Sequence, residues 1–247
     1  MLPSERYLGS LLAAAERAHG RPLTSGTTLV IDPERNGTGS ATCYPTPHAS
    51  IVWCDEGVRD RLAPIESSKS ISAEEFVAAA TGLGAVLLGY ARTRVLDGEP
   101  RRPTADPGDL AVRHVDPGDD APMSMLHDLI AACDEEDVAY ADLDLDHLDP
   151  SFTVLVTSEG TIAAYASAQP HDLDPAFDDI AVLTHPAWRG RQLGALAVHE
   201  FIRHHRAQGR PVVYRCNVDN VGSNRVAESL GLTLVTTIGA VSFAYGK

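Results

Sequence analysis

The chain of 247 residues is long enough for one large domain or two smaller ones. Apolar residues make up 44% of it and charged residues 22%, which is typical of a globular chain and excludes wholesale disorder. The 34 acidic residues outnumber the 20 basic ones and give a formal net charge of −14. Such a charge disfavours nucleic acids and anionic membrane surfaces as general partners, although a locally basic site remains compatible with it.

No stretch of the sequence reaches the roughly 18 apolar residues that a membrane span requires. The first ten residues, MLPSERYLGS, lack the basic region and apolar run of a secretion signal, so we expect a cytoplasmic protein. Its four cysteines form no CxxC pair and have no histidines at zinc-binding spacing. We therefore expect buried free thiols and no metal site.

The first hundred residues contain both helical and strand patterns. Ser72 and Glu75 have the spacing of a capping box, which predicts a helix that begins after Ser72. The Gly-, Pro- and Thr-rich stretch between the first two predicted strands is expected to be a loop. The expected elements are a helix over 5–19, strands over 27–31 and 50–53, a helix over 72–81 and a strand over 85–95.

Residues 97–109 are rich in proline, glycine and charge, which indicates a connection between domains. We place the boundary near residue 107, with an α/β domain over 1–107 and a second domain over 108–247. The second domain is expected in the order β-α-β-β-β-α-β-α-β, a mixed sheet with helices packed on it. Its strands are expected over 110–115, 152–157, 161–167, 180–184, 212–217 and 232–245, and its helices over 121–140, 191–208 and 223–230.

The stretch from Thr184 to Ala195, THPAWRGRQLGA, follows a predicted strand and leads directly into a long helix. Free N–H groups at a helix N-terminus and the positive end of the helix dipole favour an anion. Gly190 and Gly194 allow a phosphate to approach the backbone, while Arg189 and Arg191 add positive charge. The stretch matches neither GxxxxGK[ST] nor GxGxxG. The alternative is an ordinary strand-to-helix turn with solvated arginines.

The run LTHPAWRGRQLGALAV resembles the acetyl-CoA-binding motif of the GNAT N-acetyltransferase superfamily, [Q/R]-x-x-G-x-[G/A]. Gln192 departs from the pattern, because the family usually has glycine there. The run from Cys216 to Leu232 is similar to a later motif of that family through Asn220, Ser223, Glu228, Gly231 and Leu232. The run LAVRHVDPGD resembles the first strand of such domains.

The resemblance implies a mixed, mostly antiparallel sheet flanked by helices, after a smaller and divergent α/β domain. It also implies that acetyl-CoA lies between two diverging strands and leaves as coenzyme A. Backbone groups of the strand would contact the pantetheine arm, and N–H groups of residues 190–195 would hold the pyrophosphate. The residues assigned to the cofactor are Val182, Leu183, Thr184, Arg189, Gly190, Arg191, Gln192, Leu193, Gly194, Ala195 and Asn220.

Related enzymes often place a general-base carboxylate early on the fourth strand, a position that corresponds here to Asp178. Its alternative role is that of an exposed acid. The usual general acid is a tyrosine seven residues after the motif asparagine, but this position is Ala227. The remaining candidate proton donors are Tyr214, Ser223, His185 and water.

The expected activity is acetyl transfer from acetyl-CoA to a small-molecule amine, directly within a ternary complex. The acids among residues 134–149 would attract a cationic amine, or they form a solvated face. The alternatives are an acyl-CoA-binding sensor without catalysis and an acyltransferase for longer or carrier-bound acyl groups. Residues 1–107 could wall the acceptor site, form a homodimer surface, or be a degenerate duplicate of the second domain.

Overall fold

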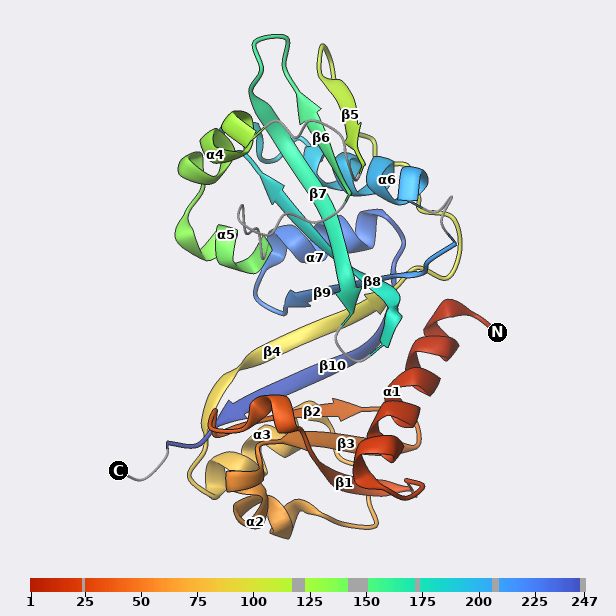
Figure 1. The fold of residues 1–247 in the computed structure, drawn as a ribbon, viewed down its shortest axis with the longest axis vertical. Helices are drawn as coiled ribbons and strands as arrows, with labels where there is room; N and C mark the ends of the chain where they lie inside the picture. The colour runs from red at the N-terminus through yellow and green to blue at the C-terminus, as the bar shows by residue number, and fades with distance from the viewer. Residues whose placement is uncertain (24, 117–122, 142–150, 172–173, 206–208, 245–247) are drawn as a thin grey trace. The chain divides into compact units, whose positions relative to one another are not determined.

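The structure, a computed structural model, describes residues 1–247 except 24, 117–122, 142–150, 172–173, 206–208 and 245–247. The chain folds into two compact units (Figure 1). The first comprises Met1–Arg94, Asn217–Asp219 and Leu234–Lys247, and the second comprises Val95–Cys216 and Asn220–Thr233. No helix in the described ranges is both long and apolar enough to span a membrane.

The first unit contains a mixed sheet in the strand order β1-β3-β2-β10-β4. Strands β1 and β3 are parallel, whereas β2 pairs antiparallel with both β3 and β10. Its elements are α1 (Pro3–His19), β1 (Gly26–Ile31), β2 (Ser40–Pro45), β3 (Ala49–Cys54), α2 (Arg59–Leu62), α3 (Ala73–Gly82), β4 (Val86–Val95) and β10 (Thr233–Ser242).

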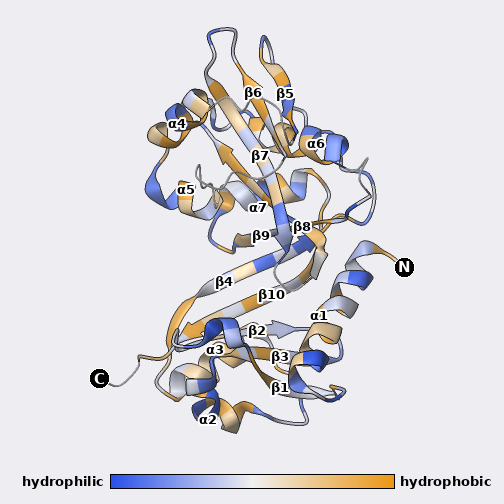
Figure 2. Cartoon of the chain, in the orientation of Figure 1, coloured by the Kyte–Doolittle hydropathy of each residue, from blue (hydrophilic) through white to orange (hydrophobic). Residues whose placement is uncertain are grey.

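Local sequence signals explain most of these elements. Helix α3 begins at the predicted capping box, in which Ser72 Oγ accepts from the Glu75 N–H and Glu75 accepts from the Ser72 N–H. Helix α1 carries both hydrophilic and hydrophobic residues and buries Tyr7, Leu11 and Ala15 (Figure 2). All six residues of β3 are buried.

The prediction of a loop between the first two predicted strands is wrong, because this stretch contains strand β2. Pairing with β3 on one side and β10 on the other satisfies the backbone of β2 and buries Ala41 and Cys43. The β10 partner lies almost 200 residues away in the sequence, so no local pattern predicts it.

The second unit contains the strand order β9-β8-β7-β6-β5, with antiparallel pairing from β5 to β8 and parallel pairing of β8 with β9. This confirms the mixed, mostly antiparallel sheet flanked by helices. Its elements are β5 (Ala111–Val115), α4 (Met123–Ala132), α5 (Glu135–Ala141), β6 (Phe152–Val156), β7 (Ile162–His171), β8 (Asp174–Thr184), α6 (Leu193–His205), β9 (Val212–Asn217) and α7 (Val221–Ser229). The single helix expected over 121–140 is two helices, α4 and α5.

The chain first passes from one unit to the other at Arg94 and Val95, not near residue 107. The reason is that the Pro-rich segment packs on the second unit. Leu96 is buried in the core beneath α6, with Ala105 and Leu110 packed against that core. The Arg101 N–H also donates to the Leu230 carbonyl over 2.9 Å. Strand β10, expected in the second domain, belongs to the first unit apart from Thr233.

The four cysteines are free thiols, and Cys43, Cys54 and Cys216 are buried. Burial raises the pKa of Cys43 to about 12 and that of Cys54 to about 11. Among the described residues, no three His, Cys, Asp or Glu side chains gather in a way that could hold a metal ion.

We expect Ser72→Ala to lower the free energy of unfolding by about 1 kcal/mol, because α3 loses its N-terminal cap. Urea unfolding measures this value. Ser68→Ala is the matched control, since Ser68 is exposed and its hydroxyl bonds to none of the described residues. Equal stability of the two variants would contradict the capping role.

Candidate coenzyme site

The site is built where β8 and β9 separate. Among the described residues, the two strands pair at two positions, Asp178 with Val212 and Asp179 with Val213. Beyond these pairs β8 continues to Thr184 and β9 to Asn217 without pairing to each other. Backbone groups of a strand point alternately to its two neighbours, so those of residues 180–183 on the β9 side face an open wedge.

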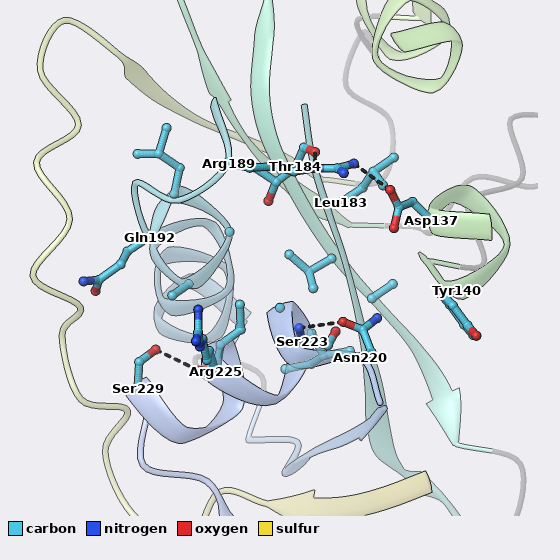
Figure 3. A pocket seen from close by; sticks show the side chains of 18 of the residues that line it. Asp137, Tyr140, Leu183, Thr184, Arg189, Gln192, Asn220, Ser223, Arg225 and Ser229 are labelled. Atoms are coloured by element: carbon cyan, nitrogen blue, oxygen red, sulfur yellow. Dashed lines mark hydrogen bonds and ion pairs between the residues drawn. The ribbon is translucent and has the colours of Figure 1, made fainter. Parts of the chain in front are cut away.

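A pocket of about 700 Å³ occupies this wedge and extends to the ends of α6 and α7 (Figure 3). The lining includes residues 180–184 at the end of β8, the loop after it and the first turn of α6. Ten of the eleven residues predicted to bind the cofactor line this pocket: Val182, Leu183, Thr184, Arg189, Gly190, Gln192, Leu193, Gly194, Ala195 and Asn220. The exception is Arg191, whose guanidinium lies over the Trp188 ring, 4.9 Å from its centroid.

The backbone N–H groups of residues 190–195 are available to a ligand. The first recorded backbone bond of α6 runs from the Leu196 N–H to the Gln192 carbonyl. Within the described part of the chain, no protein acceptor bonds to the N–H groups of the six preceding residues. Unpaired N–H groups at the positive end of a helix, here one of thirteen residues, are the arrangement that favours an anion.

Close packing and positive φ angles explain why this loop contains glycines, and they bear on the glutamine that departs from the motif. A Cβ on Gly194 would lie 2.7 Å from Thr184 Oγ1, so only glycine lets α6 approach β8 this closely. Gly190 and Gln192 both adopt positive φ, of 77° and 60°. The glycine that the family prefers at position 192 fits this geometry, and the glutamine there costs about 1–2 kcal/mol of backbone strain.

The positive charges around the pocket are not equivalent. Arg189 donates from Nε to the Thr184 carbonyl and from Nη2 to Asp137 of α5, 2.6 Å away (Figure 3). Arg225 of α7 lines the pocket, is exposed, and has no hydrogen bond or ion pair recorded within the described ranges. Arg225 is therefore the guanidinium with the least competition for an anionic ligand. The sequence patterns did not single out Arg225 or Asp137, because both come close to the loop only through the fold.

The residues of the later motif meet at the other wall of the pocket. Asn220 caps α7, accepting at Oδ1 from the Ser223 N–H over 2.9 Å (Figure 3). The Ser223 hydroxyl lies 2.9 Å from the hydroxyl of Tyr214, which reaches it from β9. Ala227 lies one turn after Ser223 and belongs to the same core cluster as Tyr214. The fold thus brings two of the candidate proton donors, Tyr214 and Ser223, together beside the pocket.

Asp178 lies outside the pocket lining. Its side chain is buried, accepts from His205 Nε2 over 2.7 Å, and is held by Nε and Nη2 of Arg210. Burial raises the pKa of Asp178, but the bonds from His205 and Arg210 outweigh burial and hold this pKa below its ordinary value. This geometry favours an ion pair at the closed end of the wedge over a general base.

Of the acidic residues among 134–149, Asp137 lines the pocket and Glu136 accepts from the Tyr140 hydroxyl. Asp142, Asp144, Asp146 and Asp149 lie outside the described residues. His185, the remaining proton-donor candidate, accepts at Nδ1 from the Ala187 N–H and does not line the pocket.

Residues 123–232 match the family model of the GNAT acetyltransferases, described as "Acetyltransferase (GNAT) family". The match lies in the second unit apart from Asn217–Asp219 and includes the whole wedge. The second unit contains a GNAT acetyltransferase domain. This assignment makes the second unit an acyltransferase domain. The search of curated proteins finds no match.

Three solved structures are similar to this chain at low sequence identity. A GCN5-related N-acetyltransferase from Sphaerobacter thermophilus is 16% identical over 66% of this chain and 55% of its own, with a TM-score of 0.49. A GNAT-family acetyltransferase from Colwellia psychrerythraea is 13% identical over 76% and 70%, with a TM-score of 0.47. A GCN5-related N-acetyltransferase-like protein from Streptococcus suis is 14% identical over 98% of both chains, also at 0.47. The alignment thus spans just over half of the Sphaerobacter protein.

We expect Asp178→Asn to lower the free energy of unfolding of the acetyltransferase domain at pH 7 by about 2 kcal/mol, because Arg210 loses its charged partner. The folded pKa of Asp178 lies below its ordinary value, so its contribution is complete above that ordinary value, about 4. It is lost as the pH falls through the folded pKa. Urea unfolding at pH 7 and pH 3 should therefore show a smaller difference between the two proteins at pH 3.

Asp109→Asn is the control for this comparison, because Asp109 is exposed and has no hydrogen-bond or ion-pair partner among the described residues. Unchanged stability of Asp178→Asn, together with loss of the acid limb of its pH–rate profile, would instead support the general-base role.

Proposed function

We propose that the GNAT domain binds acetyl-CoA in the wedge between β8 and β9 and transfers the acetyl group directly to the amine of a small molecule. The observation that carries this proposal is the set of six uncommitted N–H groups at residues 190–195, next to an unpaired strand edge. An anion site and an open strand edge together suit a ligand with a diphosphate at one end and an amide-bearing arm at the other.

The residues of the pocket fit such a ligand. The N–H groups of residues 190–195 and Arg225 would hold the phosphates. Backbone groups of Val182 and Leu183 would pair with the arm as a neighbouring strand does. The side-chain amide N–H groups of Asn220 have no acceptor recorded in the described ranges and can donate to the ligand. Bound in this way, acetyl-CoA supplies an activated acyl group as a thioester.

The chain itself then contributes positioning and electrostatics. A backbone N–H near Val182 would stabilise negative charge developing on the thioester oxygen. Fixing the arm along β8 would present the acyl carbon to an amine entering the wedge, which converts an encounter between two molecules into a local reaction.

Proton transfer at the leaving sulfur is assigned to Tyr214 and Ser223. Tyr214 is buried, and its hydroxyl lies at 2.9 Å from Ser223 Oγ on the pocket wall. Tyr214 would donate a proton to the departing thiolate, either directly or through Ser223. In this way a tyrosine from β9 would replace the one that the family carries on the helix, where this chain has Ala227.

The amine must lose a proton to react. Among the described residues that line the pocket, Asp137 alone carries a carboxylate, and Arg189 already binds it. We therefore assign no side chain as general base, and the amine is expected to arrive neutral or to give its proton to water.

Acetyl-CoA, a panel of small amines and the protein are mixed, and the release of free thiol is followed. We expect thiol release that depends on one class of amine, with initial-velocity lines that intersect when both substrates are varied, as direct transfer requires. Parallel lines would indicate an acyl-enzyme. Calorimetric binding of acetyl-CoA without thiol release in the presence of any amine would favour a sensor. Activity with longer acyl groups alone would favour an acyltransferase for longer or carrier-bound acyl groups.

Tyr214→Phe should lower kcat by about 10²-fold and remove the alkaline limb of the pH–rate profile, because that limb reports loss of the donated proton. Tyr90→Phe in the first unit is the matched control and should keep both the kcat and the alkaline limb of the natural protein. A profile unchanged by Tyr214→Phe would overturn the assignment of the proton donor, while the assignment of the coenzyme site would stand.

Arg225→Ala should weaken coenzyme A binding about tenfold and should leave pantetheine binding unchanged, because pantetheine carries no phosphate. Calorimetry at low and high salt measures both ligands, and the difference should shrink as salt screens the charge. Arg17→Ala removes an equal charge from the exposed last turn of α1 and is the control. An equal loss for pantetheine would contradict a phosphate contact.

A further inference from the structure

The segment that connects β4 to β5, residues 96–110, is bonded to the second unit along its length. The Leu96 N–H donates to the Val212 carbonyl where β9 begins, and the Arg101 N–H donates to the Leu230 carbonyl at the end of α7. The side chain of Arg101 lies against Gly231, where an added Cβ would come within 2.9 Å of Arg101 Nε. The path of the connecting segment is thus fixed by elements that also form the walls of the pocket.

Past Arg101 the connecting segment contacts the loop that precedes α6. Gln192 Nε2 donates to Thr104 Oγ1 over 3.0 Å, and the two side chains are also within bonding distance at Gln192 Oε1. Figure 3 shows the Gln192 side chain pointing away from the pocket, toward the ribbon of this segment. Although Gln192 lines the pocket, its amide is therefore directed at the protein and not at a ligand.

Gln192 is also the one described residue other than glycine with a positive φ. It immediately precedes α6, and its carbonyl accepts the first backbone bond of that helix, from Leu196. Its backbone conformation therefore sets the direction of the N–H groups on both sides of it. A strained conformation of this kind persists only where surrounding contacts hold it.

We propose that Thr104 and Gln192 are positioning residues for the coenzyme site: the bond between them holds residue 192 in the left-handed conformation that aims the N–H groups of residues 190–195 into the pocket. This inference rests on the proposed function. A glycine at position 192 reaches this conformation without help, whereas glutamine needs an external contact. The connecting segment supplies that contact.

The test is a double-mutant cycle with coenzyme A as the probe, measured by calorimetry. In the natural background, Thr104→Val should raise the Kd for coenzyme A about threefold to fivefold, the range for loss of one exposed hydrogen bond. In the Gln192→Gly background the same Thr104→Val change should have no further effect, because glycine does not depend on the bond. Thr104→Ser, which keeps the hydroxyl, should restore the affinity.

A second measurement on the ligand-free protein does not depend on coenzyme binding. Backbone chemical shifts of residue 192 report its φ, and Thr104→Val should move them away from left-handed values in the natural background only. An equal effect of Thr104→Val in both backgrounds, or unchanged shifts, would overturn the inference. If the natural protein bound no coenzyme A, the proposed function would fail, while the shifts would still decide whether Thr104 holds Gln192.

Discussion

The short pairing between β8 and β9 is the constraint on which the site depends. In the described part of β8, Asp178 and Asp179 are the residues that pair with β9. Both carboxylates are also held by arginines beside or within β9, Arg210 and Arg215. These ion pairs close one end of the wedge, where the backbone ladder ends. Beyond that point the edge of β8 lacks a partner strand, and an unpaired strand edge binds an extended ligand through backbone hydrogen bonds.

The second requirement is an anion site within a protein of formal charge −14. Long-range charge would repel a polyphosphate, so binding must come from local groups. The N–H groups before α6 satisfy this requirement because they carry partial positive charge and have no protein acceptor in the described ranges. Arg225 adds a full charge at the same pocket, whereas the charge of Arg189 is largely neutralised by Asp137.

The same pocket accounts for the departures from the family motif. The helix position that usually supplies a tyrosine is Ala227, and the hydroxyl of Tyr214 approaches the neighbouring turn of that helix from β9. The loop position that usually holds glycine is Gln192, and it adopts the backbone conformation that glycine favours. In both cases the structure places a residue from another element beside the altered position: Tyr214 of β9 contacts Ser223, and Thr104 contacts Gln192.

Much of this arrangement follows from sequence because its signals are local. The strand–loop–helix of residues 180–205 and the glycines at 190 and 194 depend on residues close together in the sequence. The helix expected over 223–230 begins earlier, at Val221, with Asn220 as its cap. Only the tertiary structure decided the features that depend on residues far apart in the sequence. Strand β2 forms through pairing with β10, the segment 96–110 packs on the second unit instead of linking free domains, and Asp178 is bound by His205 and Arg210. Alternation along a strand predicts which residues share one face of the sheet. It cannot predict which cation reaches that face, because an ion pair is determined by distance in space and not by separation along the chain.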